Sequence, residues 1–316
     1  MMQYGYTLSS EEHHPNQLVE RAKVAEERGF DFLSISDHFH PWVDAQGHSA
    51  FVWSALGGIA TVTDRIEVGI GVTCPILRIH PAIVAHAAAT TAAMMGDRFF
   101  LGIGTGEQLN EHVLGQKWPR IEIRQEMLAE AIDVMRALWT GEVTDFDGLY
   151  FDVENARIYT LPDTPPPIVM SAFGTESAKI AAEKDCGLWI NKPDRDVVDA
   201  YKSAGGTGPV VGQLSLCWAE DKDAGIDTVY EQWPTKGLSG QLSQELATPA
   251  LFEMACETVT RDDIADGLLA GPDAAAVRDG VAEFADAGFD RLHLHQIGPD
   301  QDGFFEFWSK ELQGSF

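Results

Sequence analysis

The segment from Ser36 to Trp42 holds the residue types in this chain that are best suited to chemistry. It reads Ser-Asp-His-Phe-His-Pro-Trp and follows the apolar run 32–35, which is typical of a short buried strand. A histidine side chain can take up or release a proton near neutral pH, and His38 lies where that strand would end. Trp42 adds an N–H donor and a broad ring shortly afterwards. We interpret His38 as a candidate acid–base residue with Trp42 beside it.

Carboxylates follow other apolar runs in the same way. Glu11 comes after the first run and Glu107 after the fourth. Structural interpretations stay open for several of these positions. Asp37 could cap a helix or hold the neighbouring histidine, and Trp42 could be a packing residue. Glu107, at the start of an expected helix, could simply interact favourably with the helix dipole.

Eight short apolar runs alternate with helical patterns along the chain. Strands are predicted at 3–7, 32–36, 66–72, 99–104, 168–171, 188–191, 210–218 and 291–296. Helices are predicted at 15–28, 51–61, 81–95, 121–139, 176–184, 196–203, 226–233 and 274–287. This alternation favours a single (β/α)8 TIM barrel over residues 1–316, with a doubly wound sheet plus a second domain as the alternative. A hairpin is predicted at 145–151, and residues 233–269 are expected to form an insertion near the barrel mouth.

The carboxyl ends of the predicted strands would meet at one mouth of such a barrel. Two turns rich in small residues lie there, because 104–106 follows the fourth strand and 171–175 follows the fifth and opens a helix. Free N–H groups at a helix start can hold a phosphate, and either turn is also compatible with an ordinary loop. We therefore expect the acid–base residues and these turns to share one site.

The other histidines form no metal or hydrolase signature. His293 and His295 alternate with leucines in the last predicted strand and so face the same side, where a satisfied core histidine is the simpler interpretation. No HExxH element anchors a metal site, and no Gly-x-Ser-x-Gly elbow indicates a serine hydrolase. We predict no bound metal. Four further histidines are expected at the surface: His13, His14, His48 and His112.

The chain is strongly acidic, with 49 Asp and Glu against 22 Lys and Arg and a net charge of -27. Such a surface repels nucleic acids and anionic lipids, so neither is an expected partner. Acidic pairs such as Glu11-Glu12 are expected to be solvated. The acidic excess is spread over the chain without low-complexity segments, which is typical of a halophilic protein in a salt-rich cytoplasm.

No apolar run approaches the length of a membrane span, and residues 1–6 lack the pattern of a signal peptide. We expect a cytoplasmic protein. The cysteines are scattered without a CxxC pair, so neither a zinc site nor a disulfide framework is indicated.

Five segments of the chain match motifs of one known family: 36–42, 71–76, 79–85, 104–111 and 118–120. With these motifs the chain resembles the luciferase-like flavin and deazaflavin oxidoreductases, which are (β/α)8 barrels. It is most similar to the branch that uses coenzyme F420, which includes glucose-6-phosphate dehydrogenases and secondary alcohol dehydrogenases. The match is dense from Tyr6 to about Tyr159 and dilute afterwards.

The resemblance implies a role for individual residues. His38, Trp42 and Glu107 fall on the family's catalytic positions, and Glu11 falls on the substrate side. Gly71-Val72 falls where the family has a non-proline cis peptide bond behind the deazaflavin ring. The implied cofactor contacts are Asp37, Gly71, Val72, Gly106, Asn110, Ala172, Phe173, Gly174 and Thr175.

The same resemblance implies hydride transfer between a substrate hydroxyl carbon and C5 of the deazaflavin. The substrate would be a secondary alcohol, a sugar or a sugar phosphate. Sugar-phosphate members place lysines in the C-terminal half, where this chain offers Lys192 and Arg195, and Met254 stands where relatives carry a second lysine. Cys74 is a further candidate substrate contact, and the family's dimers lead us to expect a homodimer.

Three alternatives remain at this point. An FMN-dependent luciferase-like monooxygenase would share the barrel, and the relative affinities for FMN and F420 would separate the two. A non-enzymatic cofactor-binding relative is disfavoured by the joint presence of His38, Trp42 and Glu107. A metal hydrolase on a similar barrel would be exposed by metal analysis.

Overall fold

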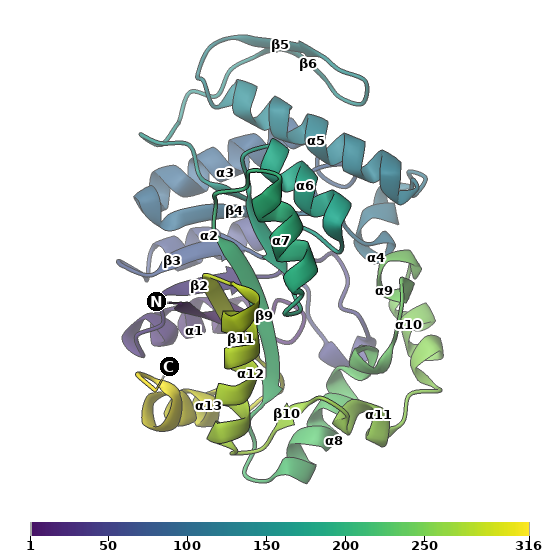
Figure 1. Cartoon of the computed structure of the whole chain (residues 1–316). Coiled ribbons are helices and arrows are strands. Elements are labelled where there is room, and N and C mark those ends of the chain that lie inside the picture. Colours follow the sequence, from purple (N-terminus) through teal and green to yellow (C-terminus); the bar gives the residue numbers. More distant parts are fainter. Residues whose placement is uncertain (1, 316) are drawn as a thin grey trace.

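Eight parallel strands close into a barrel in the computed structural model, which describes residues 2–315 (Figure 1). β1 (Gln3–Leu8) pairs with β2 (Phe32–Ile35) on one side and with β11 (Arg291–Gln296) on the other, which closes the barrel. Between them lie β3 (Glu67–Ile70), β4 (Phe99–Ile103), β7 (Ile168–Ser171), β8 (Gly187–Ile190) and β9 (Val210–Cys217). The predicted (β/α)8 barrel is confirmed.

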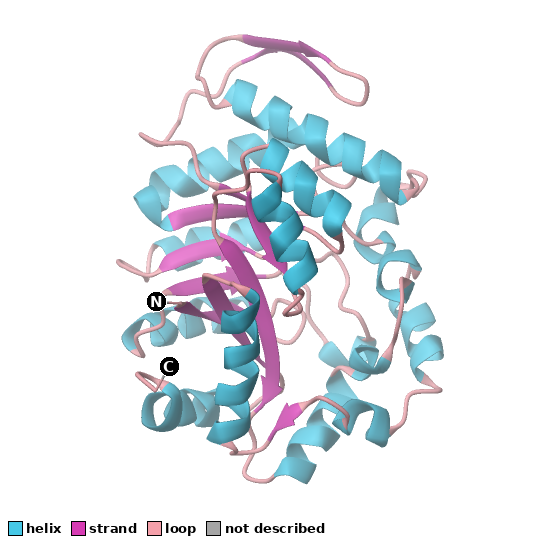
Figure 2. Cartoon of the chain, in the orientation of Figure 1, coloured by secondary structure: helices cyan, strands magenta, loops and turns pink. Residues whose placement is uncertain are grey.

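Helices form an outer layer around the strands (Figure 2). They return the chain so that each new strand runs parallel to the last. Two of them begin with a proline after a histidine N-cap, since His14 and His80 each accept a hydrogen bond from the backbone N–H two residues on. The helices between strands are α1 (Pro15–Glu27), α2 (Val52–Ala60), α3 (Pro81–Met95), α5 (Ile121–Leu138), α6 (Thr175–Glu183), α7 (Arg195–Ser203), α8 (Lys222–Gln232) and α12 (Ala274–Ala287).

A layer of four rings from alternate strands fills the middle of the barrel. Phe32, Phe100, Trp189 and His293 come from β2, β4, β8 and β11, and the rings of Trp189 and His293 lie 5.0 Å apart. The strands between them carry small residues here, since a Cβ atom at Gly69 would lie 2.0 Å from the Phe100 ring. Such layering is typical of parallel barrels, and it provides a rigid floor below the mouth.

His293 belongs to this floor. It is fully buried, its Nδ1 lies 2.7 Å from Thr7 Oγ1, and burial lowers its pKa to about 3, so the ring is neutral. His293 is therefore a core histidine, but it is not fully satisfied, because its Nε2 has no hydrogen-bond partner within the described residues.

The segment between β9 and β11 covers part of the mouth. After α8 it forms η4 (Pro234–Gly237), α9 (Leu242–Glu245), α10 (Pro249–Cys256) and α11 (Arg261–Ala265). It then returns as β10 (Leu269–Ala270), which pairs with the end of β9. A small core of its own contains Phe252 together with Val43, Leu109 and Trp42 from the loops of the first half.

Further elements decorate the barrel. An antiparallel hairpin of β5 (Thr144–Asp147) and β6 (Asp152–Ala156) lies outside α5, near the predicted position. The short helices are η1 (Asp44–Gln46), η2 (Gly96–Arg98), α4 (Gln108–Glu111), η3 (His112–Leu114), α13 (Gln301–Phe307) and the π-helix η5 (Trp308–Leu312). Over residues 2–315, none of the helices has the length and apolar character that crossing a bilayer requires.

Candidate active site

A cavity opens at the carboxyl ends of the barrel strands, beside the aromatic layer. Side chains from the ends of the barrel strands line it, joined by Trp233 and Lys236 from the segment after α8. Parallel barrels carry their active sites at this face. Of the residues selected from the sequence, the cavity contains Glu11, His38, Trp42, Gly71, Val72, Gly106, Glu107 and Phe173.

His38 lies beside a buried carboxylate. Its Nδ1 is 3.4 Å from Glu11 Oε1 and 3.3 Å from the carbonyl oxygen of His40. Both neighbours are acceptors, so Nδ1 carries the proton of the neutral ring and Nε2 is left as the acceptor. Ser9 and Ser36 donate hydrogen bonds to Glu11 Oε2 at 3.0 and 2.7 Å, which fix the carboxylate. The arrangement suits an acid–base histidine oriented by a carboxylate.

Trp42 stands next to this histidine. The two ring centroids are 4.9 Å apart, and the other side of the indole meets Phe252 of α10 edge-on at 5.2 Å. The backbone N–H of Trp42 donates to Gln46 Oε1 at 2.8 Å. The tryptophan is therefore held from two sides, by its own loop and by α10.

Asp37 points into a buried polar network rather than into the cavity. Its Oδ2 accepts a hydrogen bond from Thr73 Oγ1 and lies 2.9 Å from Arg78 Nη2. Its Oδ1 is buried and has no hydrogen-bond partner within the described part of the chain. A buried carboxylate oxygen without a donor is an atom that a donor on a bound ligand would satisfy.

Arg78 serves a second carboxylate in the same network. Its Nε lies 3.5 Å from Glu111 Oε1, and its backbone N–H donates to Glu111 Oε2 at 2.8 Å. Burial raises the pKa of Glu111 to about 7, against the opposing effect of Arg78. One arginine is shared between two carboxylates, so the charge of Glu111 is incompletely compensated.

The peptide bond between Gly71 and Val72 is cis, which confirms the bond that the resemblance implied. A Cβ atom at Gly71 would lie 2.3 Å from Ser34 Oγ and 2.6 Å from the Trp189 ring, so a side chain has no room there. Both residues line the cavity. The absence of a side chain at Gly71 thus lets Ser34 and Trp189 pack directly against this backbone.

The turn after β4 lines the cavity with Gly104, Thr105, Gly106 and Glu107, while Asn110 and Cys74 are not part of the lining. Glu107 lines the cavity at the N-cap of α4. Asn110 lies outside the lining, where its Oδ1 accepts from the backbone N–H of Phe39 at 2.8 Å and its Nδ2 donates to Glu107 Oε2 at 3.4 Å. Cys74 is buried behind Gly106, and burial raises the pKa of its thiol, which is therefore neutral.

The loop at 171–175 leads from β7 into α6. Phe173 lines the cavity and is 69% exposed, whereas Ala172 is buried. Gly174 is the N-cap of α6, Thr175 is its first residue, and no side chain caps this helix start. The first N–H groups of α6 are thus available to an acceptor such as a phosphate.

The structure places neither predicted cation in the cavity. Lys192 and Arg195 border a separate, shallow hollow. The guanidinium of Arg195 donates a hydrogen bond to the carbonyl oxygen of Asp286 on α12. The basic residue that does line the cavity is Lys236, which no motif in the sequence marks.

A second carboxylate–histidine pair beside the cavity was also not predicted. Glu12 Oε2 lies 3.0 Å from His295 Nε2, and the two side chains are 2% and 3% exposed. Glu11 is buried as well, so the expectation of a solvated Glu11-Glu12 pair is wrong. The expectation of a surface position is also wrong for His13, which is 4% exposed and whose pKa burial lowers to about 4. The sequence of two adjacent glutamates does not show that the fold buries both of them beside histidines.

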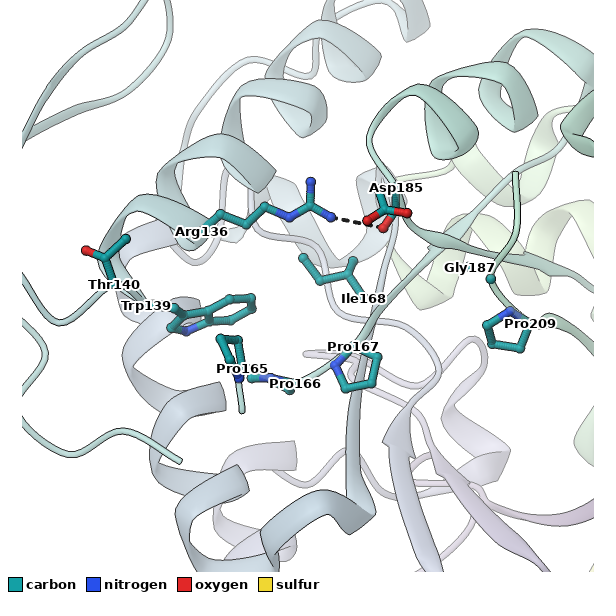
Figure 3. A pocket seen from close by; sticks show the side chains of 11 residues that line it. Arg136, Trp139, Thr140, Pro165, Pro166, Pro167, Ile168, Asp185, Gly187 and Pro209 are labelled. Carbon is teal, nitrogen blue, oxygen red and sulfur yellow. Dashed lines mark hydrogen bonds between the residues drawn. The ribbon is translucent and has the colours of Figure 1, made fainter. Parts of the chain in front are cut away.

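Another hollow, of about 560 Å³ against about 190 Å³ for the cavity, lies at the opposite end of the barrel (Figure 3). Figure 3 shows the Trp139 ring and the proline run 165–167 on its wall, with Arg136 donating to the carbonyl oxygen of Asp185. Its residues come from the amino ends of β7, β8 and β9, the face associated with stability rather than catalysis. The larger hollow is therefore not the candidate active site. The residues able to do acid–base chemistry, such as His38 and Glu11, line the smaller cavity.

Within residues 2–315, no group of three or more His, Cys, Asp or Glu side chains is arranged to hold a metal ion. The four cysteines in this range are free and buried.

The fold and the site together define a (β/α)8 barrel with a carboxylate-oriented histidine and a glycine-backed ligand cavity at the catalytic face. Residues 2–291 match the family model of luciferase-like monooxygenases, and the chain belongs to this family. The resemblance found in the sequence is thereby confirmed.

Curated relatives and solved structures narrow the comparison. The chain is 30% identical to the F420-dependent glucose-6-phosphate dehydrogenase of Microbacterium testaceum (strain StLB037), over 98% of this chain and 96% of the relative. It is 32% identical to the enzyme of the same description from Mycobacterium avium (strain 104), over 98% and 97%. A solved F420-dependent secondary alcohol dehydrogenase, in complex with an F420-acetone adduct, superposes with a TM-score of 0.89 at 27% identity, covering 99% of this chain and 98% of that one.

Proposed function

We propose that this protein is an F420-dependent oxidoreductase that acts on CH–OH groups, oxidising a hydroxyl to a carbonyl or carrying out the reverse reduction. The observation that carries the proposal is the pairing of His38 with the buried Glu11 in a cavity backed by Gly71. The relatives named above, which are described as F420-dependent dehydrogenases, support the choice of coenzyme.

Residues in and around the cavity fit this coenzyme. Behind the wall, Asp37 Oδ1 is a buried acceptor without a donor in the described chain, and the Gly71–Val72 backbone itself lines the cavity. The uncapped start of α6, at Gly174 and Thr175, offers N–H groups to a phosphate. Phe173 presents an apolar ring at the edge of the cavity. Asn110 would act indirectly, by holding the loop of Phe39.

Each residue of the candidate site has a separate task in this proposal. When bound, coenzyme F420 would supply the acceptor for the hydride of the carbinol carbon. Nε2 of His38 takes the hydroxyl proton, and Glu11 stabilises the positive charge that the ring gains. The indole N–H of Trp42 stabilises charge on the substrate oxygen. Glu107 transfers a proton or stabilises charge near the deazaflavin. As its H–C–OH group becomes C=O, the substrate loses one hydride, to the coenzyme, and one proton, to His38.

A panel of hydroxyl compounds tests the proposal. Purified protein is mixed with oxidised F420 and each compound, and the loss of the oxidised absorbance is followed at low and at high salt. Reduction of F420 by at least one secondary alcohol or sugar is expected. Consumption of oxygen with FMN that a flavin reductase keeps reduced, and no turnover with F420, would instead identify an FMN-dependent monooxygenase.

The His38→Ala variant tests the proton acceptor. Loss of a general base lowers turnover by roughly 10²–10⁴-fold, while F420 affinity, measured by fluorescence, should stay unchanged. His86→Ala, an exposed position on α3, is the matched control and should behave as the wild type. A wild-type rate in His38→Ala would remove His38 from the mechanism.

A further inference from the structure

Lys236 places a positive charge at the substrate end of the cavity. It lies on η4, and its Nζ donates a hydrogen bond to Ser215 Oγ on β9 at 2.8 Å. The same nitrogen lies 5.5 Å from the centroid of the Trp233 ring. Among the described residues that line the cavity, Lys236 is the only lysine or arginine. The side chain reaches solvent through the open cavity, although its ammonium is surrounded by protein atoms.

No carboxylate of the described chain forms an ion pair with Lys236. Glu12 is the acidic residue whose charge acts on the ammonium, but its two oxygens are already engaged by His295 Nε2 at 3.0 Å and by the backbone N–H of Gly298 at 2.8 Å. The other titratable group on this wall is His295, whose ring lies 5.0 Å from that of Trp233. The charge of Lys236 is therefore left without a partner of its own.

Two donors on this wall lack acceptors. An ammonium carries three N–H bonds, and Ser215 is the one hydrogen-bond acceptor of Lys236 in the described chain. The indole N–H of Trp233 is buried and has no acceptor among residues 2–315. Unpaired buried donors are costly, so a ligand with acceptor oxygens and negative charge would be favoured here.

We propose that Lys236 binds a carboxylate of the substrate, so that the physiological substrates are hydroxy acids whose hydroxyl carbon lies at His38. This inference rests on the proposed function and names its substrate class. It assigns substrate recognition to the segment after α8, which contributes Trp233 and Lys236 to the cavity.

The number of charges favours a carboxylate over a phosphate. A phosphate dianion requires several charged donors, and this wall offers one cation with neutral neighbours such as Gln213 and Asn191. Lys192 and Arg195 do not line the cavity and border a separate hollow. A neutral alcohol would leave the ammonium without a counter-charge.

Matched substrates test the proposal. The panel contains secondary hydroxy acids with one to five carbons between the hydroxyl and the carboxylate, the amide of each acid, and sugar phosphates. The wild type should have a kcat/KM for the best hydroxy acid at least ~10-fold above that of its amide. Equal values for acid and amide would overturn the proposal, and a preference for the sugar phosphate would replace it with phosphate recognition.

Three variants localise the effect. Lys236→Met should raise KM for the acid by roughly 10–100-fold, with kcat and F420 affinity unchanged and the amide unaffected. Lys236→Arg should retain part of the preference, and Lys192→Met, at the cation outside the cavity, should behave as the wild type. Equal losses for acid and amide in Lys236→Met would show a structural role instead.

The pH dependence gives an independent readout. Burial lowers the pKa of Lys236 to about 8, with Glu12 opposing the shift, so the ammonium loses its proton as the pH rises through that value. KM for the acid should therefore increase above pH 8 in the wild type, while KM for the amide should not. Calorimetric titration of the coenzyme-free protein with the acid, with and without the Lys236→Met change, measures the same contact without turnover. If no hydroxyl compound reduces F420 but the acid still binds through Lys236, the proposed function fails and the carboxylate site stands.

Discussion

At the scale of single residues, Glu11 separates the orientation of His38 from the binding of the coenzyme. Glu11→Gln removes the negative charge 3.4 Å from His38 Nδ1 and keeps the side-chain size. A hydrogen bond to a charged group contributes about 1.5–3 kcal/mol, so kcat should fall roughly 10–100-fold. F420 affinity should not change. Glu20→Gln, exposed on α1, is the control, and an unaltered kcat in Glu11→Gln would show that the carboxylate does not assist the histidine.

Glu111 makes stability depend on pH in the neutral range. Its pKa is about 7 in the folded protein and 4.5 as the ordinary value, so between these values the folded state binds more protons than the unfolded state. The contribution of the protonated Glu111 to the free energy of unfolding is complete below pH 4.5. It decreases by up to ~3 kcal/mol as the pH rises to 7.

Urea unfolding of wild type and Glu111→Gln between pH 5 and pH 7.5 measures this effect. The variant should show a flatter dependence of the unfolding free energy on pH, and Glu283→Gln, exposed on α12, should follow the wild type. Identical slopes in all three proteins would mean that Glu111 is ionised throughout this range.

Some residues of the candidate site could be predicted from the sequence, and others could not. His38, Trp42 and Glu107 were found because each follows a strand that the apolar pattern reveals. Glu12 and Lys236 were not, because their partners, His295 and Ser215, are distant in the sequence or belong to another element. Burial of a charged side chain is a property of the assembled fold, and local composition does not report it.

At the scale of elements, α10 supports the candidate active site through the ring of Phe252, which packs against Trp42. Phe252 is fully buried and meets Trp42 at 5.2 Å. Phe252→Ala should lower the free energy of unfolding by about 3–5 kcal/mol and raise KM for the substrate, because Trp42 loses one of its two supports. F420 affinity should be unchanged, since the proposed coenzyme contacts lie on other elements.

Leu251→Ala, on the exposed side of α10 at 40% exposure, is the control for this prediction. Urea unfolding and steady-state kinetics of both variants check it. A Phe252→Ala protein that loses F420 affinity but keeps the wild-type KM would contradict the assignment of α10 to the substrate side.

Strands and helices of the barrel could be predicted because each has a strong and regular pattern of buried positions. The predicted bounds differ from the observed ones by at most four residues; the strand predicted at 66–72, for example, begins at Glu67 and ends at Ile70. The internal structure of 233–269 could not be predicted. Its helices are short and are stabilised by contacts with the barrel, such as that of Phe252 with Trp42, rather than by a periodicity of their own.

At the scale of the whole molecule, charge should govern stability. A net charge of -27 repels itself over the folded surface, and ions reduce this repulsion as the Debye length falls from about 10 Å at 0.1 M salt to about 3 Å at 1 M. We therefore propose that the protein is adapted to high salt. Its melting temperature should rise steeply with KCl up to about 1 M and more slowly beyond, and a melting temperature independent of KCl would exclude this adaptation.

The outer face of α3 bears on the assembly of the molecule. Ile83 and Met94, eleven residues apart and so on one face of the helix, are 60% and 50% exposed, and Phe51 before α2 is 55% exposed. We propose that two copies pack through this apolar surface as a homodimer. Light scattering should give twice the mass of the chain for the wild type and the single mass for Ile83→Asp, and a monomeric wild type would contradict the proposal.

The return of the 233–269 segment as β10, joined to β9 at Leu269 and Ala270, has a consequence for how such enzymes diversify. The segment leaves and re-enters the barrel beside the same strand, so recombination between relatives can exchange it as one cassette. A chimera would inherit the coenzyme from its barrel and its substrate preference from the donor of the cassette.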